Sequence, residues 1–243
     1  MDQPEQRLAG RLALVTGATR GIGRAVALAY AREGAHLILV GRTAGALEEV
    51  DDEIRALGGG ATLLTLDLKR HDKIDALGPT IYQRWQKLDI LVGNAGILGP
   101  LSPLGHVTAE AWDDVLQVNL TANWRLIRTL DPLLRTSDAG RAIFVSSGIA
   151  ANPRAYWGCY GVSKAALEAL VKTYAREVES TAVRVNLVNP GPTRTKMRAL
   201  AYPGEDPASL KAPEDVVETF VRLAEPTCTD NGRLFDLKSG DVR

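Results

Sequence analysis

Three side chains in the second half of the chain have the types and spacing that proton transfer needs. Ser147 precedes Tyr160 by thirteen residues, and Lys164 follows Tyr160 by four. A spacing of four places Tyr160 and Lys164 one turn apart on the same face of a helix. A free phenol has a pKa of about 10, and a nearby ammonium group lowers it. The pair predicts a tyrosine that acts as a general acid or base, although taken alone it also occurs by chance.

A glycine-rich segment near the start of the chain has the composition of a phosphate-binding turn. It reads Thr-Gly-Ala-Thr-Arg-Gly-Ile-Gly over residues 16–23, between an apolar run and a predicted helix. Glycine lets the backbone turn tightly and approach a pyrophosphate, and the first amide groups of the helix attract the anion. The residues expected to contact a dinucleotide here are Gly17, Thr19, Arg20, Gly21, Ile22 and Gly23.

The residues after the second apolar run indicate which dinucleotide fits. Folds that bind NAD usually carry an acidic residue at this place, which binds the ribose hydroxyls. This chain instead has Gly41 and Arg42, and Arg20 lies in the glycine turn. Two guanidinium groups can pair with a ribose 2′-phosphate, and no carboxylate is present to repel it. We therefore predict NADP(H) as the cofactor; the alternative is that both arginines are solvated surface charges.

Short apolar runs alternate along the chain with longer amphipathic segments. Strands are expected at 12–15, 37–40, 62–66, 90–92, 142–145, 183–188 and 234–237, and helices at 21–33, 43–57, 70–86, 108–135 and 155–179. Such alternation is typical of a parallel sheet whose crossover helices cover both faces. We predict an α/β chain with a single-domain, doubly wound Rossmann fold and a central parallel sheet of about seven strands.

Polar and glycine residues follow the predicted strands at the point where each strand ends. The segments concerned are Gly17, Gly41-Arg42, Asp67, Asn94-Ala95-Gly96, Ser146-Ser147 and Pro190-Gly191. In a doubly wound fold, ligands bind beyond the carboxyl ends of the strands. The sequence therefore predicts one site at this edge of the sheet.

Composition disfavours several other classes of protein. The 243 residues carry 29 basic and 29 acidic side chains, so net charge favours neither nucleic acid nor an anionic membrane as partner. Cys159 and Cys228 form no disulfide framework, and the three histidines show no metal-ligand spacing. The first residues lack the apolar core of a signal peptide, and no apolar stretch is as long as a membrane span. We expect a cytoplasmic protein without a metal.

Taken together, these motifs resemble the short-chain dehydrogenase/reductase family, over residues 9–240. The matching positions are Thr16 to Gly23, Asn94-Ala95-Gly96, Asn119, Ser147, Tyr160 with Lys164, and Pro190-Gly191 with Thr195. Some further segments, including Trp157-Gly158-Cys159-Tyr160 and Glu205-Asp206-Pro207, look like the bacterial YciK-type oxidoreductases. That narrower resemblance brings no defined substrate with it. One departure is Gly93, where the family often has asparagine; we expect glycine to be tolerated there.

The resemblance implies a role for most of these residues. Tyr160 would protonate a carbonyl oxygen as hydride arrives from the nicotinamide, and Ser147 would polarise that oxygen. Lys164 would lower the Tyr160 pKa and bind the nicotinamide ribose, and Asn119 would hold a water that links Lys164 to solvent. Further positions that the resemblance assigns to the cofactor are Asp67, Leu68, Asn94, Ala95, Gly96, Pro190, Gly191, Thr193 and Thr195.

The implied activity is interconversion of an aldehyde or ketone with an alcohol by an NADP(H)-dependent oxidoreductase. Two other functions stay open: a non-catalytic NADP(H)-binding or sensing protein, and an enoyl reductase that acts on a C=C bond. Enoyl reductases of this family usually separate tyrosine and lysine by six residues, whereas three separate Tyr160 from Lys164. The sequence specifies neither the substrate nor its stereochemistry, and members of the family are commonly homodimers or homotetramers built through the helices at 108–135 and 155–179.

The substrate is expected to meet three segments, at 97–104, 148–157 and 196–212, the last as a lid on the single domain of residues 1–243. The apolar residues expected in the pocket are Leu98, Leu101, Leu104, Ile149, Tyr156, Trp157, Met197 and Leu200. Arg154, Lys196 and Arg198 could meet an anionic substrate, although solvation at the surface is the commoner state of such charges.

Overall fold

Seven parallel strands form one sheet in the order β3-β2-β1-β4-β5-β6-β7. The computed structural model describes residues 6–243. The strands are β1 (Leu12–Thr16), β2 (His36–Gly41), β3 (Ala61–Thr65), β4 (Ile90–Gly93), β5 (Arg141–Val145), β6 (Arg184–Asn189) and β7 (Leu234–Asp236). The strand order reverses between β1 and β4, so the crevice where ligands bind in this class of fold opens there. The predicted Rossmann fold is confirmed.

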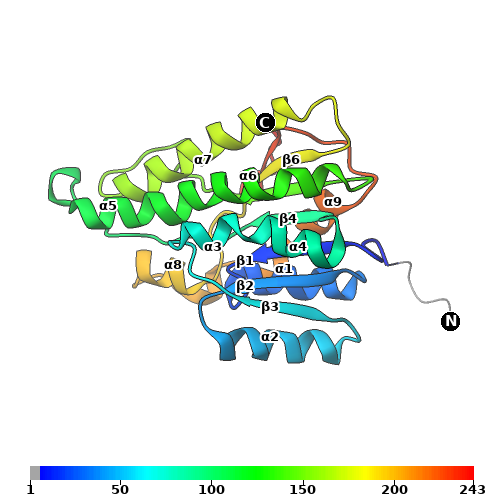
Figure 1. Ribbon diagram of the computed structural model, residues 1–243. Helices are drawn as coiled ribbons and strands as arrows, with labels where there is room; N and C mark the ends of the chain where they lie inside the picture. The colour runs from blue at the N-terminus through cyan, green and yellow to red at the C-terminus, as the bar shows by residue number, and fades with distance from the viewer. Residues whose placement is uncertain (1–5) are drawn as a thin grey trace.

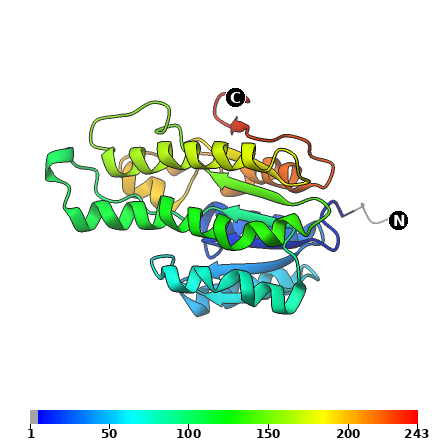
Figure 2. The ribbon, with the colours of Figure 1, turned by 45° about the horizontal axis from the view of Figure 1, so that its top comes forward.

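Helices cover both faces of the sheet (Figures 1 and 2). One face carries α1 (Gly21–Arg32), α2 (Ala44–Ala56) and α9 (Val217–Ala224); the other carries α3 (His71–Asp75), α4 (Leu77–Trp85), α6 (Ala122–Arg135) and α7 (Gly158–Glu177). Successive side chains of a strand point to opposite faces of the sheet, so each strand packs against both helix layers. In β1, Leu12 and Leu14 belong to the core with α6 and α7, and Ala13 and Val15 belong to the core with α1. No helix within residues 6–243 is both long and apolar enough to cross a membrane.

The remaining helical segments are short and lie in the connections. They are η1 (Leu104–His106), α5 (Ala109–Leu116), the π-helical turn η2 (Gln117–Thr121), α8 (Lys196–Ala201), η3 (Pro207–Ser209) and η4 (Pro213–Val216). In both views α5 and α6 follow one another end to end beside α7, and the end of α5 next to η1 projects from the body of the domain (Figures 1 and 2).

The helix predicted at 70–86 is two helices, α3 and α4, which meet at Ala76. Thr129 of α6 occupies the junction, where its hydroxyl donates to the carbonyl of Asp75 at 2.9 Å and accepts from the amide of Gly78 at 3.2 Å. A Cβ at Gly78 would collide with the backbone carbonyl of Thr129. The break is therefore a tertiary effect of close packing against α6, which the local pattern does not encode.

The helix predicted at 108–135 is likewise divided, into α5, η2 and α6. The π-helical turn η2 adds a residue to the helical repeat, and such insertions occur mostly at functional sites. Asn119 lies within η2 and is fully buried. The insertion changes which residues face the sheet and brings Asn119 inward.

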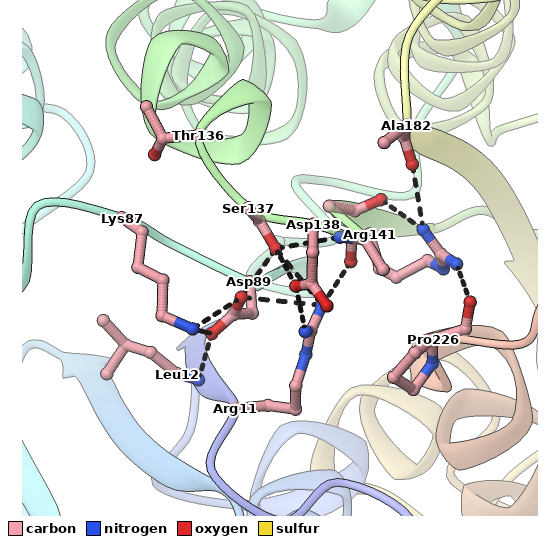
Figure 3. A network of polar contacts seen from close by, with 12 residues as sticks. Arg11, Leu12, Lys87, Asp89, Thr136, Ser137, Asp138, Arg141, Ala182 and Pro226 are labelled. Atoms are coloured by element: carbon pink, nitrogen blue, oxygen red, sulfur yellow. Dashed lines mark hydrogen bonds and ion pairs between the residues drawn. The ribbon is translucent and has the colours of Figure 1, made fainter.

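The amino ends of the central strands are joined by a buried ionic network, away from the ligand-binding edge (Figure 3). Asp89 precedes β4 and is 0% exposed. Its carboxylate accepts from the amide of Leu12 at 2.9 Å, from the hydroxyl of Ser137 at 2.6 Å, and from Lys87 at 2.9 Å. The guanidinium of Arg11 lies 3.5 Å from the same carboxylate. One anion thus ties together the starts of β1 and β4 and the connection that leads into β5.

Arg141, the first residue of β5, is held by backbone carbonyls. It is 3% exposed, and within residues 6–243 its guanidinium donates to no carboxylate. Two of these belong to Ala182, at 3.1 Å, and Pro226, at 2.6 Å (Figure 3). Arg141 therefore satisfies carbonyls of the α7–β6 and α9–β7 connections that would otherwise be buried without a donor.

Candidate active site

A cleft of about 930 Å³ lies along the carboxyl edge of the sheet, where the loops after the strands meet. It brings together all but two of the residues predicted to act in catalysis or to contact the cofactor. The exceptions are Gly23 and Asn119, which are buried next to the lining residues. Residues 6–243 contain no group of three or more His, Cys, Asp or Glu that could hold a metal ion.

The glycine turn is fixed by polar contacts with the loop after β4. The Thr16 hydroxyl accepts from the amides of Asn94, at 3.0 Å, and Ala95, at 3.1 Å. The Asn94 side chain donates to the carbonyls of Thr16, at 2.8 Å, and Gly17, at 3.3 Å. Gly17 has a φ of +65°, a conformation that favours glycine. These contacts set the backbone of the turn before any ligand arrives.

The start of α1 is prepared for an anion. A Cβ on Gly23 would meet the carbonyl of Gly17 and the amide of Asn94, so only glycine lets the helix lie this close to the turn. Arg20 is the N-cap residue of α1, its backbone is extended, and its side chain makes no capping hydrogen bond. The first amides of the 12-residue helix therefore remain available to a pyrophosphate.

The far end of the cleft presents unpaired cations. Arg20 and Arg42 are exposed and line the cleft, and neither forms an ion pair within residues 6–243. At Gly41 an added Cβ would lie 2.7 Å from the Thr19 methyl group and 3.0 Å from Leu47. A carboxylate side chain at the end of β2 would therefore have to displace the side chains of Thr19 and Leu47. This arrangement fits a ribose 2′-phosphate better than it fits free ribose hydroxyls.

Two further lining residues at this end were missed in the sequence, Arg24 and Thr43. Arg24 lies one turn after Arg20 on α1 and pairs with Glu53 of α2. Thr43 is the N-cap residue of α2 and makes no side-chain capping bond, so its hydroxyl is free for a ligand. A threonine immediately before a helix was the available signal for Thr43.

Helix α7 carries Tyr160 and Lys164 into the middle of the cleft, one turn apart as predicted. The Lys164 ammonium group donates to the carbonyl of Val145 at 2.7 Å and lies 5.8 Å from the centre of the Tyr160 ring. Burial raises the pKa of the Tyr160 phenol, and a hydrogen bond with Ser147 offsets this only in part. Burial lowers the pKa of Lys164 to about 8.

The prediction that Lys164 lowers the Tyr160 pKa below its ordinary value is therefore wrong for this structure. Both groups are enclosed, and burial disfavours the charged form of each: phenolate for the tyrosine and ammonium for the lysine. The ammonium is engaged by a backbone carbonyl rather than by the phenol oxygen. Tyr160 is accordingly held in its protonated form at neutral pH, which is the form that can donate a proton.

Replacing Lys164 with methionine is expected to change how stability depends on pH. The pKa of Lys164 is lowered on folding from 10.5 to about 8, so the folded state binds the proton more weakly than the unfolded state. The resulting cost to the folded state is complete below pH 8 and is relieved as the pH rises to 10.5. Between pH 8 and 10.5 we therefore expect the free energy of unfolding of the wild type to rise by about 3 kcal/mol relative to that of the variant. Urea denaturation of both proteins at matched pH values measures this; parallel pH dependences would contradict it.

The two serines after β5 have different surroundings. Ser146 is 2% exposed, and its hydroxyl donates to the carboxylate of Glu168 on α7 at 2.6 Å. Ser147 lines the same cleft as Tyr160, and its side chain is near enough to offset part of the rise in the pKa of that phenol. The geometry therefore agrees with the thirteen-residue spacing in selecting Ser147 as the serine that faces a ligand.

The buried amide of Asn119 joins three elements. Its oxygen accepts from the amide of Ile97 at 2.8 Å, and its nitrogen donates to the carbonyl of Ile97 at 2.9 Å and to the hydroxyl of Ser163 at 3.0 Å. These bonds fasten the loop after β4 to α7, one residue before Lys164. All the side-chain polar atoms of Asn119 are thus engaged, and its role in holding a water stays a prediction.

Gly93 is required rather than merely tolerated. A Cβ at this position would lie 2.6 Å from the side-chain oxygen of Asn123 and would also strike the ring of Phe144. Asn123 needs this space because its amide donates to the backbone carbonyl of Asn119 at 2.8 Å. The asparagine that the family often has here would not fit without rearrangement of α6.

Apolar side chains line some of the cleft beyond Ser147 and Tyr160. Of the eight apolar residues expected here, Leu98, Ile149, Trp157 and Met197 line the cleft. The other four expectations were wrong, because these side chains face solvent outside the cleft: Leu101, Leu104, Tyr156 and Leu200. Alternation between pocket and solvent in irregular loops follows the backbone path, which the sequence pattern does not give.

Aromatic and charged side chains of the segment after β6 close over this part. The ring of Tyr202 lies 5.7 Å from that of Trp157, which lies 6.0 Å from that of Tyr160, measured between centres. The Arg198 guanidinium lies 3.7 Å from the centre of the Tyr202 ring and forms two 2.6 Å hydrogen bonds with Glu205. These contacts connect the predicted lid at 196–212 to the tyrosine at the centre of the cleft.

Comparison with known proteins gives consistent matches along the chain. The sequence profile for short chain dehydrogenases matches residues 11–206. The uncharacterized oxidoreductase YciK of Escherichia coli K12 is 40% identical over 243 residues, covering 98% of this chain and 96% of that protein. A short chain dehydrogenase of Shigella flexneri 2a, solved with NADP, has a TM-score of 0.92 at 39% identity and covers 96% of this chain and 99% of its own. One of Escherichia coli CFT073, solved with NADPH, has a TM-score of 0.92 at 39% identity, with coverages of 97% and 100%.

Proposed function

Because this chain belongs to the short-chain dehydrogenase family, we propose that it is an NADP(H)-dependent oxidoreductase that reduces an aldehyde or ketone to an alcohol. The observation that carries the proposal is the set of residues that line one cleft. Ser147, Tyr160 and Lys164 line it together with Arg20 and Arg42, which form no ion pair within residues 6–243. Bound NADPH would supply the hydride.

The chain's own residues supply placement and the proton. Tyr160 donates its proton to the carbonyl oxygen of the substrate, and its raised pKa keeps that proton available at neutral pH. Ser147 hydrogen-bonds the same oxygen and stabilises the negative charge that develops there. Lys164 binds the ribose next to the nicotinamide. Asn119 keeps the loop after β4 and α7 in register, so that these groups face one another.

The preference for NADP(H) over NAD(H) rests on the residues at the end of the cleft. Arg20 and Arg42 bind the 2′-phosphate, together with the hydroxyl of Thr43 and the free amides at the start of α2. Two structures at 39% identity contain NADP or NADPH, which supports this choice. The remaining cofactor contacts proposed are Gly17, Thr19, Gly21, Ile22, Gly23, Asp67, Leu68, Asn94, Ala95, Gly96, Pro190, Gly191, Thr193 and Thr195.

Replacing Arg42 with alanine is expected to weaken NADPH binding by about 10- to 100-fold, the value of one or two charge-assisted hydrogen bonds. NADH binding should change by less than about threefold, because NADH lacks the 2′-phosphate. Fluorescence titration of both cofactors measures the ratio of the two dissociation constants. An unchanged ratio in Arg42→Ala would show that Arg42 does not contact the phosphate.

We also propose that the protein is a homodimer or homotetramer built through the outer surfaces of α6 and α7. A groove of about 360 Å³ runs between these helices. Trp124 on its rim is 43% exposed, and the guanidinium groups of Arg125 and Arg128 lie 5.5 and 5.7 Å from its ring centre. An exposed tryptophan flanked by arginines is the composition that protein interfaces favour.

Replacing Trp124 with glutamate is expected to shift the protein toward the monomer at micromolar concentration, because a carboxylate would have to be desolvated in the contact. Light scattering coupled to size-exclusion chromatography measures the mass. The exposed Tyr82 on α4 offers a matched control, since its replacement by glutamate should leave the assembly intact. If Trp124→Glu has the same mass as the wild type, the subunits meet elsewhere.

A further inference from the structure

We propose that the substrate carries an anionic group, and that Arg154 binds this group at the entrance to the cleft. This inference rests on the proposed function, whose substrate class it narrows. Arg154 and Asn152 line the cleft from the β5–α7 connection, which leads into the helix that carries Tyr160. The only hydrogen bond of the Arg154 side chain within residues 6–243 goes to the Tyr202 hydroxyl, at 3.1 Å. Most of its five donors therefore remain free for a ligand.

The charges around the substrate part of the cleft are unbalanced. Glu205, in the segment after β6, does not line the cleft, and Arg198 engages both of its oxygens. No carboxylate of residues 6–243 pairs with Arg154 or with Lys196, although both cations line the cleft. Three acidic residues line the cleft, and none of them pairs with Arg154 or Lys196: Asp67 follows β3, Asp236 bonds to Asn189, and Glu214 is on η4, which packs against α1. A neutral substrate would leave these cations unmatched, whereas an anionic one would complement them.

Arg154 is also connected, through its hydrogen bond to Tyr202, to the aromatic side chains that shape the site. Its partner Tyr202 packs on Trp157, and Trp157 packs on Tyr160. Tyr156, between Arg154 and the helix, has a φ of +73°, which is strained for a residue with a side chain. Its carbonyl accepts from the amide of Ser102 at 3.0 Å, which holds the strained turn in place. Such strain is characteristic of positions where a loop conformation is needed for binding.

The test compares carbonyl compounds that differ only in charge: benzaldehyde, 4-carboxybenzaldehyde and 4-formylphenyl phosphate, each with NADPH. The wild type is expected to prefer an anionic compound, and the phosphate and carboxylate arms identify which anion fits. In Arg154→Gln the ratio of kcat/KM for the preferred anionic compound to that for benzaldehyde should fall by about 10- to 100-fold, through KM. The exposed Arg176 at the end of α7 provides the control, and Arg176→Gln should keep the wild-type ratio.

A second control separates the effect of the Arg154 charge from the effect of its contact with Tyr202 in the segment after β6. Tyr202→Phe removes the hydroxyl that Arg154 contacts but leaves its charge, so the ratio should stay near that of the wild type. A ratio that falls equally in Tyr202→Phe and Arg154→Gln would overturn the proposal. So would equal use of charged and neutral compounds by the wild type, which would leave the proposed reductase function standing.

Binding measurements test the proposed anion site at Arg154 independently of turnover. Calorimetric titration of the NADPH-loaded protein with 4-(hydroxymethyl)benzoate and with benzyl alcohol should show preference for the acid, lost in Arg154→Gln. If no carbonyl compound is reduced in a Tyr160-dependent manner, the proposed function fails, and these titrations still show whether Arg154 forms an anion site. Equal affinities for the acid and the alcohol would contradict the proposal.

A separate observation concerns the pair formed by the buried Ser146 and the partly buried Glu168. We infer that Glu168 is a positioning residue for Ser147. The 2.6 Å bond from Ser146 to Glu168 fastens the residue next to Ser147 onto α7, the helix that carries Tyr160. Lys172 lies 3.8 Å from the same carboxylate and helps to balance its charge. Ser147 and Tyr160 come from different elements, and the bond between Ser146 and Glu168 holds these two elements together.

Replacing Glu168 with alanine is expected to lower kcat by about 10- to 100-fold with little change in the KM for NADPH, because a displaced Ser147 no longer meets the carbonyl oxygen. Glu168→Gln keeps an acceptor oxygen and should restore most of the rate, which a loss of charge alone would not predict. A crystal structure of Glu168→Ala with Ser147 Oγ within about 0.5 Å of its wild-type position would overturn the inference, whatever the rates.

Discussion

Replacing Tyr160 with phenylalanine is expected to lower kcat for carbonyl reduction by about 10²- to 10⁴-fold, the usual contribution of a general acid. The substitution removes only the hydroxyl. The ring stays packed against Trp157, at 6.0 Å between centres, so the shape of the cleft should be kept. NADPH oxidation measured against a panel of aldehydes, ketones and quinones gives the rate, and fluorescence titration gives NADPH affinity.

The control for this variant is cofactor binding. NADPH affinity should stay within a few-fold of the wild type, because Arg20, Arg42 and the glycine turn lie at a distance from the phenol. Turnover that persists undiminished in Tyr160→Phe would contradict the assignment of Tyr160 as the proton donor. Turnover that fails together with NADPH binding would show that the variant is misfolded, which circular dichroism would reveal.

Replacing Asp89 with alanine is expected to lower the free energy of unfolding by about 3–5 kcal/mol, the cost of removing one partner from a buried ionic network. The fully buried carboxylate accepts from Leu12, Ser137 and Lys87, and Arg11 lies beside it. Its loss leaves the guanidinium of Arg11, only 6% exposed, short of a counter-charge. Urea denaturation followed by circular dichroism measures the difference from the wild type.

Asp138 offers the matched control, because it also pairs with Arg11 but its side chain is 76% exposed. Asp138→Ala should cost less than about 1 kcal/mol, as exposed ion pairs usually do. If both variants lose the same small amount, the network is not a stabilising feature of the amino ends of the strands. Because the network lies away from the cleft, Asp89→Ala should bind NADPH normally where it remains folded.

The sequence predicts both the fold and the collection of the site residues in one cleft, because both follow from the alternation of apolar runs with amphipathic segments. Buried parallel strands read as continuous apolar runs, and their carboxyl ends share one edge of the sheet. The residues after Thr16, Gly41, Gly93 and Val145 therefore had to meet in one cleft. The four-residue spacing of Tyr160 and Lys164 likewise fixed their relative placement once α7 was recognised as a helix.

The features that the sequence did not reveal depend on tertiary contacts. The break between α3 and α4 requires Thr129 from a distant helix, and the π-helical turn at Asn119 has no periodic signature of its own. The direction of the Tyr160 pKa shift depends on how deeply the phenol is buried, which no local spacing specifies. The same holds for Arg198: its pairing with Glu205 is seen only when the segment after β6 is folded.

The most direct test of the proposed function follows the hydride itself. The protein would be incubated with NADPH carrying deuterium at both C4 positions of the nicotinamide and with the carbonyl panel, and the alcohol products analysed by mass spectrometry. We predict an alcohol with one deuterium on the former carbonyl carbon, formed by the wild type about 10²- to 10⁴-fold faster than by Tyr160→Phe. Tight binding of NADPH without deuterium transfer to any carbonyl compound would contradict the proposal and favour a protein that binds the cofactor without using it.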